Sequence, residues 1–144
     1  MQNLSAKYGK TLNLDKLTSY CPGCGHGIVT RLVAEAIETL GIRERAIAIV
    51  GIGCGGFSHH YMDVDAIEAT HGRSPSFAVG YKLCRPDNIV FTYCGDGDSC
   101  AIGLGDLMHA ANKGMPITSI MVNNSVFGMT GGQMSPESLP GQKT

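Results

Sequence analysis

The stretch IVFTYCGDGDSCAIGLGDLMHAANKGMPITSIMVNN, residues 89–124, decides the fold of this chain. An apolar run at its start stops at Asp96, a carboxylate between two glycines. A helical pattern then covers residues 98–113, and a second apolar run, residues 117–122, stops at two side-chain amides. The order strand, helix, strand predicts a βαβ unit, and therefore an α/β fold with a parallel sheet and flanking helices.

Two oxygen-bearing side chains follow the two predicted strands. Asp96 and Asn124 are expected at the carboxyl ends of parallel strands, where ligands of open α/β sheets bind. Carboxylate and amide oxygens suit Mg²⁺, which takes few protein ligands together with substrate phosphates. The glycines beside Asp96 allow the backbone to approach a bound anion closely. The simpler alternative is that both side chains only cap a helix or a turn.

The remaining pattern extends the α/β reading over most of the chain. A helix is predicted after residue 24, ending at Gly41, and residues 46–50 read as a buried parallel strand. A polar loop is expected from residue 61, then a helix over residues 76–84, and Gly114 is placed to end the helix before the last strand. The apolar face of the first helix is predicted to contain Val29, Leu32, Val33, Ala36, Ile37 and Leu40.

Four motifs together resemble one known family. Gly95-Asp96-Gly97 followed by Asn123-Asn124 resembles the thiamine-diphosphate motif, and NSVFGMTGGQ at 124–133 resembles the β subunit of 2-oxoacid:ferredoxin oxidoreductases. CPGCGH at 21–26 and GIGC at 51–54 are similar to the same family at matching places. The resemblance runs from about Tyr20 to the end of the chain and implies the diphosphate-binding domain fold of thiamine-dependent enzymes.

The resemblance also implies a domain organisation. Residues 1–144 are expected to form a single thiamine-diphosphate-binding domain that lacks its C-terminal part, because no strand or helix is predicted after Asn124. Residues 1–19 are expected to form an N-terminal arm that is free to lie on a partner.

The family's functional positions carry over to this chain as implied ligands. Asp96, Asn124 and the main-chain carbonyl of Val126 would bind Mg²⁺, which bridges the diphosphate. The implied contacts of thiamine diphosphate are Ile52, Gly53, Cys54, Gly55, His71, Gly97, Asp98, Gly128 and Met129. Cys21, Cys24 and Cys54 would ligate a 4Fe-4S cluster, whose usual fourth cysteine lies in a part of the family that this chain does not contain.

Other cysteines and histidines have simpler interpretations. A zinc site formed by Cys21, Cys24 and a third group such as His26 is the alternative to the cluster. The adjacent histidines His59 and His60 are interpreted as structural residues. The three cysteines without a motif, Cys84, Cys94 and Cys100, are expected to be small buried side chains.

The implied reaction is the oxidative decarboxylation of a 2-oxoacid with coenzyme A to acyl-CoA and CO₂, with electrons passing through the cluster to ferredoxin. 2-Oxoglutarate and branched-chain 2-oxoacids are the leading candidate substrates. No glutamate here fits the group that activates the aminopyrimidine ring, which in the family comes from a pyrimidine-binding α subunit, alongside γ and ferredoxin-like δ subunits in some members. The chain alone is therefore expected to be inactive. Phe57 stands where many relatives have a basic residue for the substrate carboxylate.

Two other classes of protein share part of this pattern. A thiamine-dependent non-redox decarboxylase or synthase would have the GDG and paired-Asn motifs, but it gives no reason for the three motif cysteines. Residues 51–56, GIGCGG, formally match the GxGxxG fingerprint of an NAD-binding Rossmann domain. That fingerprint should open a helix, whereas the bulky residues 57–61 show no amphipathic order.

Composition excludes several other classes. Charged residues are 16% of the chain, glycines number 20, and the net charge is −1, so there is no electrostatic case for binding nucleic acid or an anionic membrane. No apolar stretch reaches the ~18–20 residues of a membrane span, and the polar N-terminus does not resemble a signal peptide. Six cysteines without a targeting segment favour metal or redox chemistry in the cytoplasm.

Overall fold

The first strand, β1 (Ala46–Val50), is buried along its whole length at the centre of the sheet. In the computed structural model, which describes residues 9–144, it lies between β2 (Asp65–Glu68) and β3 (Ile89–Gly95), and β4 (Ile117–Val122) completes the order β2-β1-β3-β4. All three pairings are parallel. The predicted α/β fold with a parallel sheet is confirmed.

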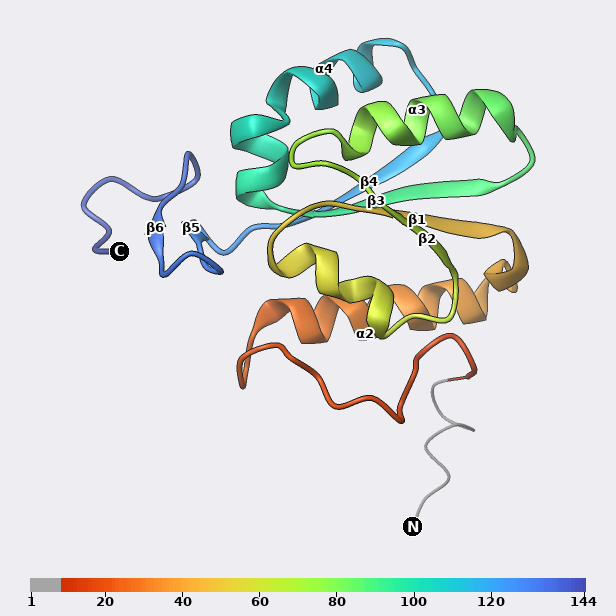
Figure 1. The fold of residues 1–144 in the computed structure, drawn as a ribbon, viewed down its shortest axis with the longest axis horizontal. Coiled ribbons are helices and arrows are strands. Elements are labelled where there is room, and N and C mark those ends of the chain that lie inside the picture. The colour runs from red at the N-terminus through yellow and green to blue at the C-terminus, as the bar shows by residue number, and fades with distance from the viewer. Residues whose placement is uncertain (1–8) are drawn as a thin grey trace.

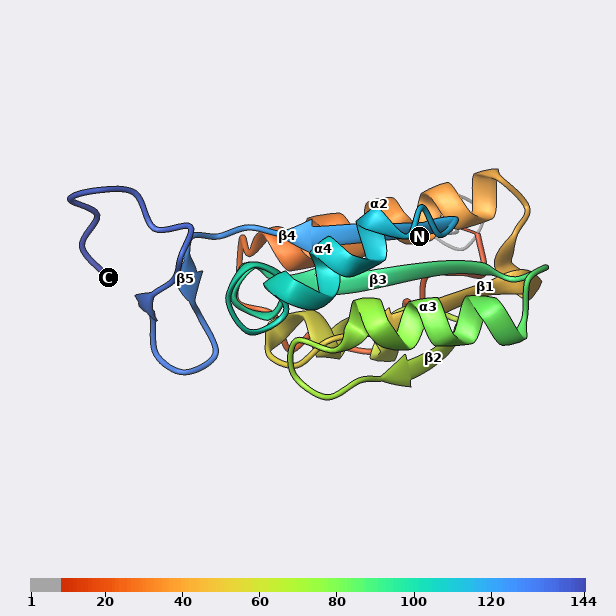
Figure 2. The same cartoon turned by 90° about the horizontal axis from the view of Figure 1, so that it is seen from above.

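Helices cover both faces of this sheet. α2 (Gly25–Thr39) lies on one face, and α3 (Ser74–Cys84) and α4 (Leu104–Asn112) lie on the other (Figures 1 and 2). Successive residues of β1 point to opposite faces, so one core cluster joins Ala48 and Val50 to the α2 side and the second joins Ile49 to the α3 side. No helix within residues 9–144 is both long and apolar enough to cross a membrane.

Helix α2 buries a different face from the predicted one. Leu32 and Leu40 are 49% and 69% exposed, and Ala36 is exposed as well, so the prediction was wrong for these three residues. The buried positions are His26, Thr30, Ala34 and Ile37. Two of these buried residues, His26 and Thr30, are polar. Because the prediction counted only apolar residues, it assigned burial to the wrong face of the helix. Gly41 ends this helix region with a φ of +63°, as predicted.

The helix predicted over residues 98–113 is divided in two. A π-helical turn, η3 (Gly97–Ile102), is followed by a break at Gly103, after which α4 begins. The Gly103 amide donates to the carbonyl of Asp98 at 2.9 Å, and a Cβ at Gly103 would collide with that carbonyl. The backbone of Gly72 lies close to the same point, so a residue with a Cβ would not fit at the break.

Short elements that the sequence analysis missed lie at the edges. β2 falls in the predicted polar loop, since it is an edge strand with mostly exposed side chains. Beyond β4, the hairpin of β5 (Val126–Phe127) and β6 (Gln133–Met134) occupies a segment predicted to contain no strand. The hairpin and the C-terminus project beyond one end of the sheet (Figure 1). Two helical turns, η1 (Arg43–Arg45) and η2 (Cys54–His60), flank β1.

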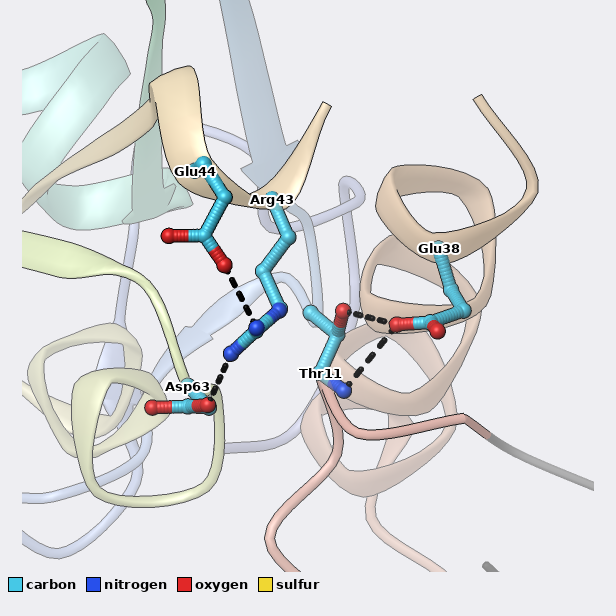
Figure 3. A network of polar contacts seen from close by, with 5 residues as sticks. All are labelled: Thr11, Glu38, Arg43, Glu44 and Asp63. Atoms are coloured by element: carbon cyan, nitrogen blue, oxygen red, sulfur yellow. Dashed lines mark hydrogen bonds and ion pairs between the residues drawn. The ribbon is translucent and has the colours of Figure 1, made fainter. Parts of the chain in front are cut away.

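The described part of the predicted N-terminal arm packs on its own domain. Residues 1–8 lie outside the described residues. Thr11 is fully buried and donates to the Glu38 carboxylate from its hydroxyl at 2.6 Å and from its amide at 3.2 Å. The hydroxyl contact lowers the pKa of Glu38. Beside this pair, Arg43 bridges Asp63 and a neighbouring glutamate (Figure 3).

A buried hydroxyl joins α2 to the sheet. The Tyr93 hydroxyl donates to the carbonyl of His26 at 3.2 Å and lies 3.1 Å from the Thr30 hydroxyl. Burial raises the pKa of Tyr93 to about 12. We expect Tyr93→Phe to lower the free energy of unfolding by about 1–2 kcal/mol, because it leaves buried polar groups without a partner. Urea denaturation measures this, with Tyr81→Phe on α3 as the control; equal effects of both changes would contradict it.

Candidate functional site

A cavity of about 300 Å³ lies at the carboxyl edge of the sheet. Loops after all four strands and the β5–β6 hairpin contribute to its wall. It is lined by all three predicted magnesium ligands, Asp96, Asn124 and Val126, and by all but one of the predicted cofactor contacts, namely Ile52, Gly53, Cys54, His71, Gly97, Asp98, Gly128 and Met129. The structure thus brings together residues from four separate segments of the sequence.

The remaining predicted contact, Gly55, does not line the cavity. A Cβ at Gly55 would lie 3.2 Å from the backbone of Cys94, so this glycine lets the loop after β1 pack on β3. The loop continues into η2, which is a seven-residue 3-10 helix. A dinucleotide fingerprint opens a regular α-helix, and the NAD-binding alternative is not supported.

Asp96 presents a nearly buried carboxylate to the cavity. The residue is 3% exposed. One carboxylate oxygen accepts from the amide of Gly97 at 2.7 Å, and the other accepts from the Ser135 hydroxyl at 3.1 Å. Ser135 is a site residue that sequence reasoning missed. It lies in the C-terminal tail, where no motif or periodicity signals the contact.

The loop after β4 holds the amide of Asn124 beside the cavity. Ser125 has a φ of +62°, an uncommon conformation for a residue with a side chain. Two local hydrogen bonds stabilise the turn: the Asn123 side-chain oxygen accepts from the Ser125 amide at 2.9 Å, and that of Asn124 accepts from the Val126 amide at 3.3 Å. A carboxylate, an amide oxygen and a main-chain carbonyl on one cavity wall form a donor set that suits Mg²⁺.

Asp98 and His71, which both line the cavity, contact one another through their side chains. His71 Nδ1 lies 2.5 Å from Asp98 Oδ1, with the side chains 41% and 1% exposed. The same oxygen accepts from the amide of Gly72 at 2.7 Å. The carboxylate of Asp98 is therefore directed toward neighbouring loops, although the residue lines the cavity.

The three motif cysteines share one region of the structure. Cys21 is exposed, and Cys24 and Cys54 are half-buried. Burial and then the nearby thiols of Cys24 and Cys21 raise the pKa of Cys54. Of these three, Cys54 lines the cavity. Within residues 9–144, no group of three His, Cys, Asp or Glu side chains is placed to hold a single metal ion.

This geometry weighs against the zinc alternative. The His26 ring stacks on Tyr20 with centroids 5.3 Å apart, and its Nδ1 lies 3.4 Å from the Tyr93 hydroxyl. Burial lowers the pKa of His26 despite the opposing charge of Asp96, and the ring packs in an aromatic cluster with Tyr20 and Tyr93. A 4Fe-4S cluster distributes its thiolates over several irons and does not need them to converge on one ion.

The other singled-out residues lie outside the cavity. Phe57 packs near Tyr20, with ring centroids 6.4 Å apart, so the family's position for a basic residue faces the aromatic cluster. The rings of His59 and His60 have their centroids 3.9 Å apart, and neither residue lines the cavity. Cys94 is buried and Cys100 is half-buried. The expectation of burial was wrong for Cys84, which is exposed at the end of α3.

Comparison with known proteins identifies the family. The family described as "Thiamine pyrophosphate enzyme, C-terminal TPP binding domain" matches residues 32–144. Ketoisovalerate oxidoreductase subunit VorA of Methanothermobacter thermautotrophicus is 46% identical over 127 residues, which are 88% of this chain and 27% of the relative. 2-Oxoglutarate synthase subunit KorB of Archaeoglobus fulgidus is 38% identical over 142 residues, which are 98% of this chain and 53% of the relative.

A solved structure matches almost the whole chain. It is a 2-oxoglutarate:ferredoxin oxidoreductase from Magnetococcus marinus, with 2-oxoglutarate, coenzyme A and succinyl-CoA bound. The TM-score is 0.88 at 36% sequence identity, and the match covers 99% of this chain and 48% of that one. The chain thus spans about half the length of these relatives, or less. It belongs to the family of thiamine pyrophosphate enzymes, as a C-terminal TPP-binding domain, and resembles the β subunit of 2-oxoacid:ferredoxin oxidoreductases.

Proposed function

We propose that this chain forms the diphosphate-binding half of the active site of a 2-oxoacid:ferredoxin oxidoreductase. The observation that carries the proposal is the cavity at the carboxyl edge of the sheet. Its wall joins the acidic Asp96, the amide of Asn124 and the glycine-rich loops after β1 and β3. When a multiply charged diphosphate leaves water, it needs a metal ion, amide donors and a close approach of the backbone. Asp96 and Asn124 offer ligands for the metal, and the glycine-rich loops offer the amides and the close approach.

The residues of the chain have separate tasks in this proposal. Asp96, Asn124 and the carbonyl of Val126 hold Mg²⁺. Gly53 leaves open space beside the diphosphate, and Gly97 leaves room for the Phe127 ring. Apolar side chains of the wall, among them Ile52 and Phe127, exclude water. Thiamine diphosphate, when bound, supplies the nucleophilic thiazolium carbon for decarboxylation.

The overall reaction converts a 2-oxoacid and coenzyme A to acyl-CoA and CO₂, with two electrons passing to ferredoxin. A pyrimidine-binding α subunit supplies the glutamate that activates the cofactor, so the site forms at an interface and the chain alone is inactive. Oxidation of a 2-oxoacid by the purified chain without a partner would contradict this. γ and ferredoxin-like δ subunits are further candidate partners. Relatives named for ketoisovalerate and for 2-oxoglutarate support both candidate types of substrate.

An iron–sulfur cluster is the second part of the proposal. Cys21, Cys24 and Cys54 supply three thiolates, and the effect of Cys24 and Cys21 on the pKa of Cys54 supports their placement around one group. Binding iron displaces the thiol protons, which overcomes the raised pKa of Cys54. The fourth ligand comes from outside these residues, because clusters of this type normally take four.

Metal and cofactor analysis tests both parts at once. We expect the chain, co-expressed with its genomic neighbours and purified anaerobically, to contain about four irons with matching sulfide and one thiamine diphosphate. Cys54→Ser should remove the iron, whereas Cys84→Ser, at an exposed position of α3, should leave it unchanged. Iron retained in Cys54→Ser would contradict the ligand assignment. Cofactor without iron in the unaltered protein would favour the non-redox decarboxylase or synthase.

A further inference from the structure

The proposed metal ligands lie on two separate loops. Asp96 follows β3, whereas Asn124 and Val126 follow β4. The parallel pairing of these strands ends at Gly95 opposite Val122, so the sheet places only the start of each loop. Mg²⁺ requires ligands close to octahedral geometry. Contacts that join the two loops beyond the sheet therefore decide whether the ligand set is formed before the metal binds.

A tight turn near the C-terminus reaches both loops. It is formed by Ser135–Ser138, with the sequence Ser-Pro-Glu-Ser, after the β5–β6 hairpin (Figure 1). The amide of Ser138 donates to the carbonyl of Ser135 at 3.0 Å and closes the turn. Pro136 stands at the second position, where its fixed φ favours a turn. We call this four-residue turn the serine clasp.

Hydrogen bonds inside the clasp determine where its two hydroxyl groups donate. The Ser135 hydroxyl oxygen accepts from the amide of Glu137 at 3.2 Å, and the Ser138 hydroxyl oxygen accepts from the amide of Ser135 at 2.9 Å. Each hydroxyl has a single proton to donate. That of Ser135 goes to Oδ2 of Asp96 at 3.1 Å, and that of Ser138 goes to the carbonyl of Ser125 at 2.5 Å. The clasp thus donates one hydrogen bond to each loop.

The bond from Ser135 fixes the plane of the Asp96 carboxylate. Ser135 is 5% exposed and Asp96 is 3% exposed, so water has little access to this contact. The other carboxylate oxygen accepts from the amide of Gly97 at 2.7 Å. A carboxylate offers about four lone-pair positions, so these two bonds orient Asp96 and still leave positions for a metal ion.

The bond from Ser138 holds the loop that contains the other ligands. Ser125, whose carbonyl accepts it, lies between Asn124 and Val126 and has a φ of +62°. A residue with a side chain keeps this conformation only where the surrounding contacts enforce it. The side-chain amide of Asn123 adds a longer contact to Glu137 of the clasp, at 3.4 Å.

We propose that the serine clasp positions the metal site: Ser135 orients the Asp96 carboxylate, and Ser138 fixes the loop that carries Asn124 and the carbonyl of Val126. Both serines are positioning residues and act through the ligands they contact. That the clasp joins the two loops is a property of the chain alone. That the group bound between the loops is Mg²⁺ rests on the proposed function.

The effect on the loop is tested without metal or cofactor. Nitrogen-15 relaxation of the labelled chain measures the backbone order parameters of Ser125 and Val126. We expect about 0.85 in the unaltered chain, the value of rigid backbone, and less than about 0.6 in Ser138→Ala. Ser76→Ala is the matched control, because the Ser76 hydroxyl also donates to a carboxylate, that of Asp106 at 2.7 Å. It should leave both values unchanged. A loop that stays equally rigid in Ser138→Ala would overturn the proposal.

The effect on the metal is tested by calorimetric titration with thiamine diphosphate at increasing Mg²⁺ concentrations. We expect Ser135→Ala and Ser138→Ala each to raise the half-saturating Mg²⁺ concentration about tenfold, as loss of a group that orients a metal ligand does. At saturating Mg²⁺, the affinity for the cofactor should return to that of the unaltered chain. Ser76→Ala should change neither quantity.

Two results of this titration would contradict the role of the clasp. An unchanged Mg²⁺ requirement in Ser135→Ala would show that Asp96 needs no orienting partner. A loss of affinity that persisted at saturating Mg²⁺ would show damage to the cofactor pocket instead of the metal site. If the unaltered chain binds no cofactor at any Mg²⁺ concentration, the proposed function fails, while the order parameters still decide whether the clasp holds the loop.

Discussion

Asp96→Asn is expected to weaken the binding of thiamine diphosphate at least about 100-fold in the presence of Mg²⁺, which corresponds to about 2.7 kcal/mol. The substitution removes the negative charge from the proposed metal ligand. The asparagine can still accept from the amide of Gly97 and bond with the Ser135 hydroxyl, the two contacts that Asp96 makes in the structure. The free energy of unfolding should therefore change by no more than about 1 kcal/mol.

Calorimetric titration with and without Mg²⁺ separates metal binding from other effects. The unaltered chain should lose affinity when Mg²⁺ is omitted, whereas Asp96→Asn should be weak under both conditions. Asp106→Asn is a matched control, because Asp106 lies nearby but accepts from Arg73 and Ser76 outside the cavity. Mg²⁺-dependent affinity that survived Asp96→Asn would show that the metal is held elsewhere.

Gly72→Ala is expected to lower the free energy of unfolding by about 3 kcal/mol, from backbone strain together with overpacking. Gly72 has a φ of +77°, a conformation that costs any residue with a Cβ. An added Cβ would also lie 2.8 Å from the amide nitrogen of Gly103. Because that contact is with backbone, side-chain rotation cannot relieve it.

Gly80→Ala provides the comparison for this substitution. Gly80 is exposed on α3, and a Cβ there would meet no atom within 4 Å. Its replacement should stabilise the protein by up to about 1 kcal/mol through helix propensity. Urea denaturation of both variants measures the difference. Gly72→Ala with the stability of the unaltered chain would contradict the close approach of the two loops.

The sequence alone predicted the parts of this protein that depend on local pattern. The central strands, the ends of helices at Gly41 and Gly114, and the positions of Asp96 and Asn124 after strands follow from apolar runs and glycine placement. Parallel strands then place those two side chains at one edge of a sheet. The family resemblance supplied most of the cavity wall, including the loop that contains Gly128.

Tertiary structure decided the features that depend on contacts between distant segments. The contact of Ser135 with Asp96 and that of Asp98 with His71 join residues with no shared motif or period. The break at Gly103 lies where the loop containing Gly72 approaches the chain so closely that only a glycine fits. The buried face of α2 includes His26 because the Tyr93 hydroxyl satisfies polar groups of that helix. In each case the decisive partner lies dozens of residues away along the chain, so local sequence pattern carries no record of it.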